Sequence, residues 1–356
     1  MIFSILLNSG PSYGKSFSDA QYNSTERYDL IIIPFKDLET HAPAGQQPGT
    51  TKGIILHAPT ESSVFITISV LQNRSVGCHY IVPQHTLHQL QEEAKFLLAQ
   101  QESLPESEKL SPVALNACRV IMAFQGNKNR IPVLQLAPDH MYVKQAGISQ
   151  WKDWPRDADG KLNPSTIGIE CANSRTYTKD KYDLFRYSGM QMQVLVSLLS
   201  HLLTKHGLSG ADIVTHTDVA WDRPDDLYKS DPGPFFDYQT LARHGLGIVP
   251  LAKDFPPLPK DRNNQKDMIS WIQTCFQIMG YRPCPVTGEM DVNTLKIIRA
   301  YALHFFPECP KYTSTGYDFG PLVHSLLHHP WAPYILTQQD GSVLSSGIET
   351  IPDLLT

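Results

Sequence analysis

The chain has 356 residues, of which 18% are charged, and its formal net charge is -5. This length exceeds the roughly 250 to 300 residues at which a single core stops growing, so we expect two domains. Both signs of charge are spread along the chain, which argues against nucleic-acid binding. No apolar run approaches the roughly 20 residues that would span a bilayer, and no signal peptide is visible in the opening MIFSILL stretch.

Six short apolar segments are rich in β-branched residues and are bounded by Gly, Pro, Asn or Asp, which predicts β-strands. In chain order these segments are 29–35, 53–57, 76–82, 131–137, 165–170 and 212–216. Helical patterns occupy 86–102 and 188–206, and the second ends at Gly207, as a C-terminal glycine would make it do. The alternation predicts an α/β fold with a mixed central β-sheet flanked by helices.

A proline-rich polar run, LAKDFPPLPKDRNN, lies near 251–264 and predicts a domain boundary. Beyond it the sequence predicts a small all-α domain of three helices at 262–330, followed by a tail at 331–356. The apolar face of its first helix is formed by Ile269, Ile272, Phe276 and Met279, and Gly280 ends that helix; Leu295, Ile298 and Ala302 repeat the pattern.

The six cysteines form no CxxC pair, which argues against a zinc ribbon or a thioredoxin motif. Cys275, Cys284 and Cys309 are close enough in sequence for one disulfide bridge. Adjacent strand residues point to opposite faces, so Cys78 and His79 cannot act together as a nucleophile and its base.

Two histidines and one aspartate are candidate metal ligands. His57 ends the strand segment GIILH, His216 ends DIVTH, and Asp231 lies in the turn YKSDPGPFFDY. Three protein ligands with an open fourth position distinguish catalytic zinc from closed structural zinc. On these residues alone, each histidine can also be an ordinary polar residue at a strand end.

Two further residues are candidates for catalysis. Glu170 alternates onto the strand face of Gly168, so it can face a cleft while its neighbours enter the core. Lys229 stands two residues before Asp231, where a positive charge can oppose a developing oxyanion. The alternatives are that Glu170 is an ordinary solvent-exposed residue of a strand and that Lys229 is an ordinary solvated residue of a loop.

The motifs IILH, GCHYIV, AGIS, STIGIECAN, IVTHTDVA and KSDPGPFFDY occur in the order found in zinc-dependent N-acetylmuramoyl-L-alanine amidases of type 2. The chain resembles the AmiD-like branch of this family over 28–250. The resemblance implies one zinc ion per chain held by His57, His216 and Asp231. It also implies that Glu170 is the catalytic acid/base and that Lys229 assists at the oxyanion.

Several positions depart from the family pattern. The residues after the first histidine are Ala58 and Pro59, the usual Trp-His-Ala-Gly run reads KQAG at 144–147, and a helical insertion occupies about 84–128. Gln145 and Ala146 are candidates to line the substrate cleft. His79 is a further candidate there, but a buried, hydrogen-bonded structural role is favoured for it. These departures predict a changed substrate preference with the hydrolytic chemistry retained.

The resemblance implies hydrolysis of the amide between N-acetylmuramic acid, in ordinary or anhydro form, and the L-alanine of the peptidoglycan stem peptide. Peptidoglycan and muropeptides are the expected partners, in the bacterial cell envelope or periplasm, with a cytoplasmic location as the alternative. The other functions considered are a recognition protein that binds muropeptide without cleaving it, and a zinc peptidase that cuts within the stem. The sequence does not indicate the oligomeric state.

The region after the boundary resembles a peptidoglycan-binding domain in its IQTCFQIMGY and TGEMDVNT segments. This predicts a role in targeting, so that a chain ending near Pro259 would still bind zinc and cleave soluble muropeptides. The alternative is that these helices pack on the amidase domain and help to shape its cleft.

Overall fold

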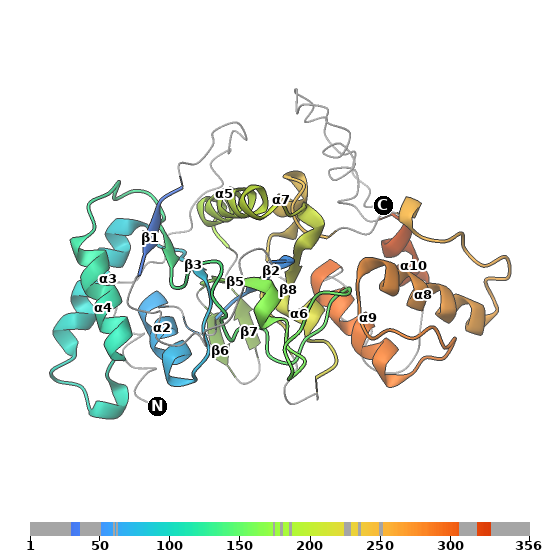
Figure 1. The fold of residues 1–356 in the computed structure, drawn as a ribbon, viewed down its shortest axis with the longest axis horizontal. Helices are drawn as coiled ribbons and strands as arrows, with labels where there is room; N and C mark the ends of the chain where they lie inside the picture. Colours follow the sequence, from blue (N-terminus) through green and yellow to red (C-terminus); the bar gives the residue numbers. More distant parts are fainter. Residues whose placement is uncertain are drawn as a thin grey trace, which may run out of the picture.

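The computed structural model describes residues 30–35, 51–59, 61, 63–173, 175–178, 181–184, 187–223, 229–233, 236–248, 252–305 and 319–328. At its centre lies a six-stranded sheet with the strand order β1-β4-β3-β5-β2-β8 (Figure 1). The strands are β1 (Ile32–Pro34), β2 (Gly53–His57), β3 (Tyr80–Val82), β4 (Val133–Gln135), β5 (Thr166–Cys171) and β8 (Ile213–Thr215). Each lies within or overlaps one of the six predicted segments.

The sheet is mixed, as predicted, because β3 and β4 pair antiparallel while all other neighbours pair parallel. Strand β2 lies between β5 and β8, and its last residue, His57, is opposite Glu170 of β5. The residue before it, Leu56, is opposite Thr215 of β8. The carboxyl ends of these three parallel strands therefore meet at one edge of the sheet.

One face of the sheet is covered by α5 (Gly189–His206), with α7 (Tyr238–Arg243) beside it. Ser188 caps the start of α5 by accepting a hydrogen bond from the amide of Gln191. The helix ends at Gly207, whose φ of 64° is a left-handed conformation that glycine adopts without strain. The buried partners of α5 in the sheet are Ile54, Leu56, Ile167, Ile169 and Ile213.

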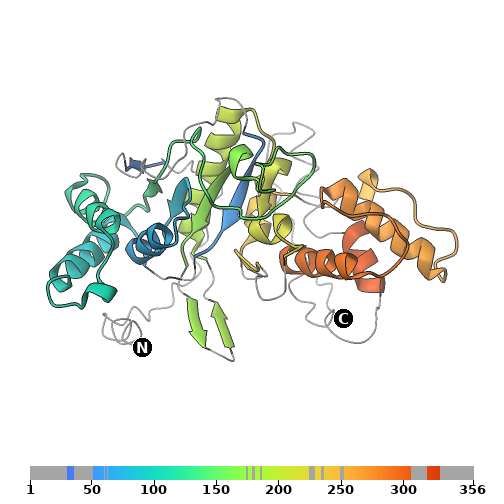
Figure 2. The same cartoon turned by 60° about the horizontal axis from the view of Figure 1, so that its bottom comes forward.

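The opposite face is covered near β1, β3 and β4 by α2 (Val64–Asn73), α3 (Leu87–Gln100) and α4 (Pro112–Ala123). The segment 84–128 therefore contains two helices, of which the sequence predicted only α3. A separate hairpin of β6 (Arg175–Thr178) and β7 (Lys181–Leu184) projects beyond the sheet (Figure 2). Single 3-10 turns occupy Glu106–Glu108, Asn163–Ser165, Gly210–Asp212 and Ala252–Asp254.

A buried carboxylate, that of Asp139, ties the end of α5 to β3. Its Oδ2 lies 2.7 Å from the ammonium of Lys205 and 2.8 Å from Nε2 of His206, and the Tyr80 hydroxyl donates to its Oδ1. Burial alone would raise the pKa of Asp139, but these hydrogen bonds and the Lys205 charge outweigh burial and lower that pKa. Asp139 is therefore held as a carboxylate.

Among the described residues, three helices follow the proline-rich run, as the sequence predicted: α8 (Gln265–Met279), α9 (Val292–Phe305) and α10 (Phe319–Leu327). The predicted apolar face of α8 is buried, and Gly280 ends this helix. The predicted face of α9 is partly wrong, because Leu295 and Ala302 are only half-buried. The residues that fill the core instead include Ile297, Tyr301, His304 and Phe305.

Cys275 and Cys284 are free thiols, so the structure contains no bridge between these two. Cys309 and the predicted tail at 331–356 lie outside the described residues. Among the described helices, none combines the length and the apolar character needed to cross a membrane.

One hydrophobic core extends across the predicted boundary at 251–264. It includes Trp151 and Trp221 from the first part of the chain, together with Phe276, Tyr281 and Tyr301 from the second. The rings of Trp151 and Tyr281 meet edge to face with their centroids 4.9 Å apart. The C-terminal helices therefore share buried apolar surface with the sheet-containing part of the chain.

Candidate metal centre and active site

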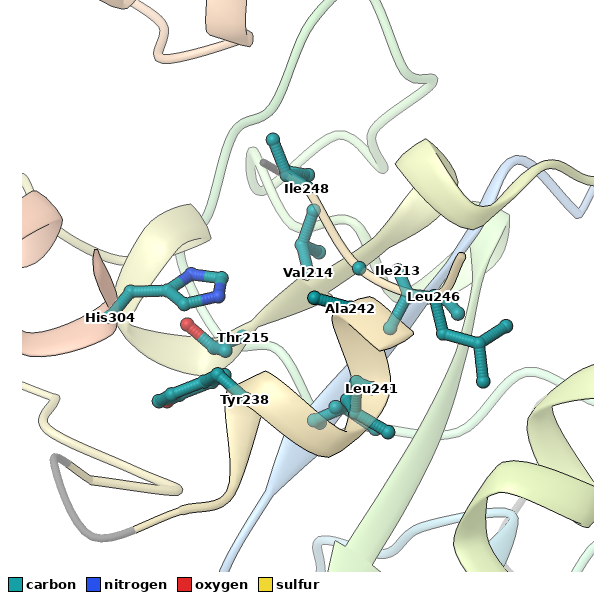
Figure 3. Close-up of a pocket in the computed structure, with 11 residues that line it drawn as sticks. Ile213, Val214, Thr215, Tyr238, Leu241, Ala242, Leu246, Ile248 and His304 are labelled. Atoms are coloured by element: carbon teal, nitrogen blue, oxygen red, sulfur yellow. The ribbon is translucent and has the colours of Figure 1, made fainter. Parts of the chain in front are cut away.

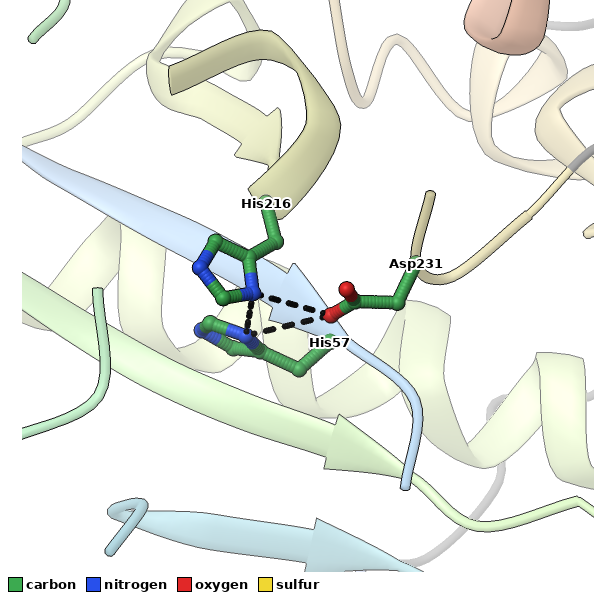
Figure 4. A group of neighbouring side chains, drawn as sticks. All are labelled: His57, His216 and Asp231. Carbon is green, nitrogen blue, oxygen red and sulfur yellow. Dashed lines mark hydrogen bonds and ion pairs between the residues drawn. The ribbon is translucent and has the colours of Figure 1, made fainter. Parts of the chain in front are cut away.

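Three side chains converge at the edge where β2 and β8 end (Figure 4). Nδ1 of His57 lies 3.0 Å from Nδ1 of His216, which in turn lies 3.0 Å from Oδ2 of Asp231. The remaining pair, His57 Nδ1 and Asp231 Oδ2, is 3.4 Å apart. The structure thus brings together all three residues that the sequence predicted as metal ligands.

The other ring nitrogen of each histidine is bonded to a neutral oxygen. Nε2 of His57 lies 2.5 Å from Oε1 of Gln145, and Nε2 of His216 lies 3.2 Å from the carbonyl oxygen of Ala146. Because both oxygens only accept hydrogen bonds, each Nε2 must carry the proton and each neutral imidazole presents a bare Nδ1. The two lone pairs are therefore directed into the same small space.

This donor set fits a zinc ion. Two bare imidazole nitrogens and a carboxylate at such short range repel one another unless a cation lies between them. Zinc bonds of 2.0 to 2.1 Å in tetrahedral geometry separate ligand atoms by about 3.3 Å, close to the distances of this cluster. Partners that hold the second nitrogen of each ligating histidine are also typical of zinc sites.

Without a metal ion, the pKa values of the three side chains are shifted in different directions. Burial alone would raise the pKa of Asp231, but the two histidines hold it well below its ordinary value. Burial lowers the pKa of His216 to about 4, so its imidazole is neutral at neutral pH. Burial also acts to lower the pKa of His57, but the neighbouring Asp231 and Glu170 carboxylates raise it overall.

His216 is the first residue of a short helix, α6 (His216–Val219), that follows β8 directly, and not the last residue of a strand as predicted. Thr215 caps this helix in a reciprocal arrangement with Asp218. The next residue, Thr217, donates from its amide (3.2 Å) and its hydroxyl (3.1 Å) to the carbonyl oxygen of Asp231. One helical turn therefore carries His216 and holds the backbone of Asp231.

The turn that contains Asp231 is fixed from its other side as well. The peptide bond between Asp231 and Pro232 is cis. The hydroxyl of Tyr238, at the start of α7, donates to the carbonyl oxygen of Gly233 at 3.3 Å. The Asp231 carboxylate is therefore presented from a segment with backbone contacts to both α6 and α7.

Glu170 is the last residue but one of β5, lies opposite His57 and leaves only 9% of its surface exposed. It is close enough for its charge to raise the pKa of His57. Lys229 is half-buried, and its carbonyl oxygen accepts a hydrogen bond from the Thr217 hydroxyl at 3.3 Å. Both residues therefore lie on segments that border the cluster.

His79 and Ala146, both named as candidates for the substrate cleft, are fully buried, as the structural interpretation of His79 requires. Nε2 of His79 bonds the carbonyl oxygen of Met141 at 3.0 Å, and its Nδ1 accepts from the amide of Gly168 at 3.0 Å. Burial lowers its pKa to about 4, so His79 is a neutral structural histidine. Ala146 contributes its carbonyl oxygen, which accepts from His216.

Gln145, also expected in the cleft, lies against His57 instead. Its Nε2 donates to the Thr166 hydroxyl at 2.7 Å, which directs its Oε1 toward His57. A Cβ atom on Gly168 would lie 2.9 Å from Cδ of Gln145, so the glycine leaves the room that this side chain occupies. A sequence signal for this contact is Gly168, because a glycine within a strand often marks the close approach of another group.

Two histidines at adjoining strand ends, together with a carboxylate from a neighbouring turn, form a donor set that is typical of hydrolases with a catalytic metal. A family model described as N-acetylmuramoyl-L-alanine amidase matches residues 46–234, more than half of the chain. The chain belongs to this amidase family.

Individual relatives agree with this assignment. The N-acetylmuramoyl-L-alanine amidase AmiD of Escherichia coli (strain K12) is 28% identical over 193 residues, which cover 47% of this chain and 66% of that protein, just under two thirds of its length. The crystal structure of AmpDh3 from Pseudomonas aeruginosa has a TM-score of 0.50 at 19% identity, covering 92% of this chain and 100% of that one. The second likeness shows that the fold is shared.

Proposed function

We propose that the chain is a zinc-dependent amidase that hydrolyses the bond between the lactyl carbonyl of N-acetylmuramic acid and the L-alanine of the stem peptide. The observation that carries this proposal is the convergence of two Nδ1 atoms and one carboxylate oxygen, with both Nε2 atoms tied to neutral oxygens. Membership of the amidase family supports the choice of bond. One zinc ion per chain is expected, held by His57, His216 and Asp231.

An amide is a poor electrophile with a poor leaving group, so both ends of the bond need assistance. When bound, zinc polarises a carbonyl oxygen and makes water acidic enough to attack at neutral pH. We assign Glu170 to take the proton from the attacking water and to return it to the departing alanine nitrogen. The position of Glu170 beside His57 supports this role.

Lys229 is assigned to oppose the negative charge that develops on the carbonyl oxygen. Its backbone is joined through Thr217 to the segment that carries His216, which keeps this part of the chain beside the cluster.

The proposed location is the bacterial cell envelope, where peptidoglycan and its fragments are the partners. Binding of the intact wall by residues 262–330 is a separate proposal, to be tested by sedimentation with sacculi.

The decisive experiment uses purified protein and defined muropeptides, in ordinary and anhydro form, with the products identified by mass spectrometry. We expect about one zinc ion per chain, release of the intact stem peptide, loss of hydrolysis on chelation and recovery with added zinc. Cleavage within the stem would identify a peptidase, and binding without cleavage would identify a recognition protein. Full activity of metal-free protein would reject the zinc mechanism.

A further inference from the structure

The acidic residue two positions after His216 is completely buried. Asp218 Oδ2 accepts from the amide and the hydroxyl of Thr215, at 2.9 and 2.7 Å, and lies 2.7 Å from Nδ1 of His304. Its Oδ1 accepts from the hydroxyl of Tyr281 at 3.0 Å. Because a carboxylate only accepts, His304 must be the donor through Nδ1.

Two of these partners come from the C-terminal helical region. Tyr281 follows α8, and His304 lies near the end of α9, separated from Asp218 by 63 and 86 residues of sequence. A buried carboxylate requires such donors, because removing one leaves part of its charge without compensation.

Asp218 belongs to the short helix that connects two of the proposed ligands. With four residues, α6 is too short to be stable by itself, so its position depends on its contacts. His216 is its first residue, and Thr217 holds the Asp231 carbonyl. Whatever fixes Asp218 therefore also fixes the geometry of His216 and Asp231.

His304 reaches the Asp231 turn by a second route. Its ring lies 4.3 Å, centroid to centroid, from the ring of Tyr238, whose hydroxyl donates to the Gly233 carbonyl oxygen. Figure 3 shows His304 beside Thr215 and Tyr238, at the polar end of a cavity otherwise lined by aliphatic side chains. That cavity, of about 10 Å³, has room for one water molecule at most and is too small for a substrate.

We propose that the C-terminal helical region is a positioning element of the metal centre: Tyr281 and His304 hold Asp218, and through α6 they fix His216 and Asp231 relative to His57. His57 itself lies on the central strand β2 and depends on the sheet. This inference rests on the proposed zinc site, and it gives the helical region a role in addition to any binding of the cell wall.

The test compares two Tyr→Phe variants of the full-length protein. Tyr281→Phe removes the hydroxyl that bonds Asp218, whereas Tyr301→Phe removes an equally buried hydroxyl that bonds Ser325 within the helical region. Zinc affinity is measured by competition with a chromophoric chelator, and site geometry by the visible spectrum of the cobalt-substituted protein. Thermal unfolding of the metal-free proteins measures any general loss of stability.

We expect Tyr281→Phe to weaken zinc binding about tenfold and to alter the cobalt spectrum, while Tyr301→Phe stays within about twofold of the parent. A second pair separates hydrogen bonding from packing. His304→Asn keeps a donor near the position of Nδ1 and should bind zinc better than His304→Leu, which keeps bulk without a donor.

Equal zinc affinity of the parent, Tyr281→Phe and His304→Leu would overturn the positioning role, even if both variants unfold at lower temperature. A parent that binds zinc but releases no stem peptide would instead reject the proposed function and leave the positioning result interpretable. The two failures are therefore distinguishable.

Discussion

Replacing Gln145 by methionine tests how much the metal centre depends on the hydrogen bond behind His57. Methionine has nearly the same length as glutamine and fills the space beside Gly168, but its thioether is a weak acceptor. The Oε1 atom that it replaces lies 2.5 Å from Nε2 of His57. The variant therefore removes one strong acceptor with little change in packing.

The expected magnitude follows from the tautomers of His57. In the metal-free variant the proton can move to Nδ1 and be shared with Asp231, whose Oδ2 is 3.4 Å away, so little is lost. With zinc on Nδ1 the proton must stay on Nε2, where it would face no good acceptor. A buried, unsatisfied donor costs about 1 to 3 kcal/mol. Because only the metal-bound state has this unsatisfied donor, zinc binding is weakened about 5- to 150-fold.

Competition with a chelator measures this change directly, and activity at limiting zinc should fall in parallel and recover when zinc is added. Gln145→Glu is the matched control, because it keeps an acceptor oxygen at the same reach and should retain most of the zinc affinity. If the methionine variant bound zinc as tightly as the parent, the hydrogen bond from His57 would have no role in metal binding.

Three further predictions use other regions. Glu170→Gln should retain zinc and fold but lower turnover at least about 100-fold; a variant as fast as the parent would move proton transfer elsewhere. Because the pKa of Asp139 is lowered, its stabilising effect is complete above about pH 4 and is lost as pH falls through that lowered pKa. Asp139→Asn should therefore make the free energy of unfolding less dependent on pH in the acid range. If the pH dependence stayed the same, the contact between Asp139 and Lys205 would not be the source of the acid sensitivity. The shared core favours the alternative to the independent targeting domain expected from the sequence. Truncation near Pro259 should therefore lower the free energy of unfolding by at least about 3 kcal/mol, because it removes side chains that pack on Trp151, and should abolish cleavage of soluble muropeptides. A stable, active fragment would refute the shared core.

The strands were predictable because β-branched apolar runs bounded by turn residues are local signals. The bounds of β2 (Gly53–His57) match the predicted segment. Strand order and the antiparallel pairing of β3 with β4 were not predictable, because they depend on contacts between segments far apart in sequence. Helix α2 was also missed, since its sequence VFITISVLQN is rich in β-branched residues that favour strands.

The cluster of proposed metal ligands was predictable because each of them ends or follows an apolar strand or lies in a distinctive turn. The residues that position them were not. Gln145 was expected to contact substrate, because its place in the sequence does not show that its amide turns toward His57. The contacts of Asp218 with Tyr281 and His304 join separate helices, and no periodicity or spacing in the sequence marks them.

The arrangement of strands also bears on how such a chain can evolve. Glu170 and His57 lie opposite each other near the ends of neighbouring strands, and His216 directly follows the next strand, so their spacing is set by the distance of about 4.8 Å between paired strands. Insertions outside the sheet, such as the helices within 84–128, can change which polymer reaches the site without moving these groups. Asp231 alone among the proposed ligands lies in a loop. Changes within 84–128 can therefore alter the substrate range, and changes in the loop that carries Asp231 can alter the metal preference. Either can occur without the other, while the spacing of the groups on the sheet is preserved.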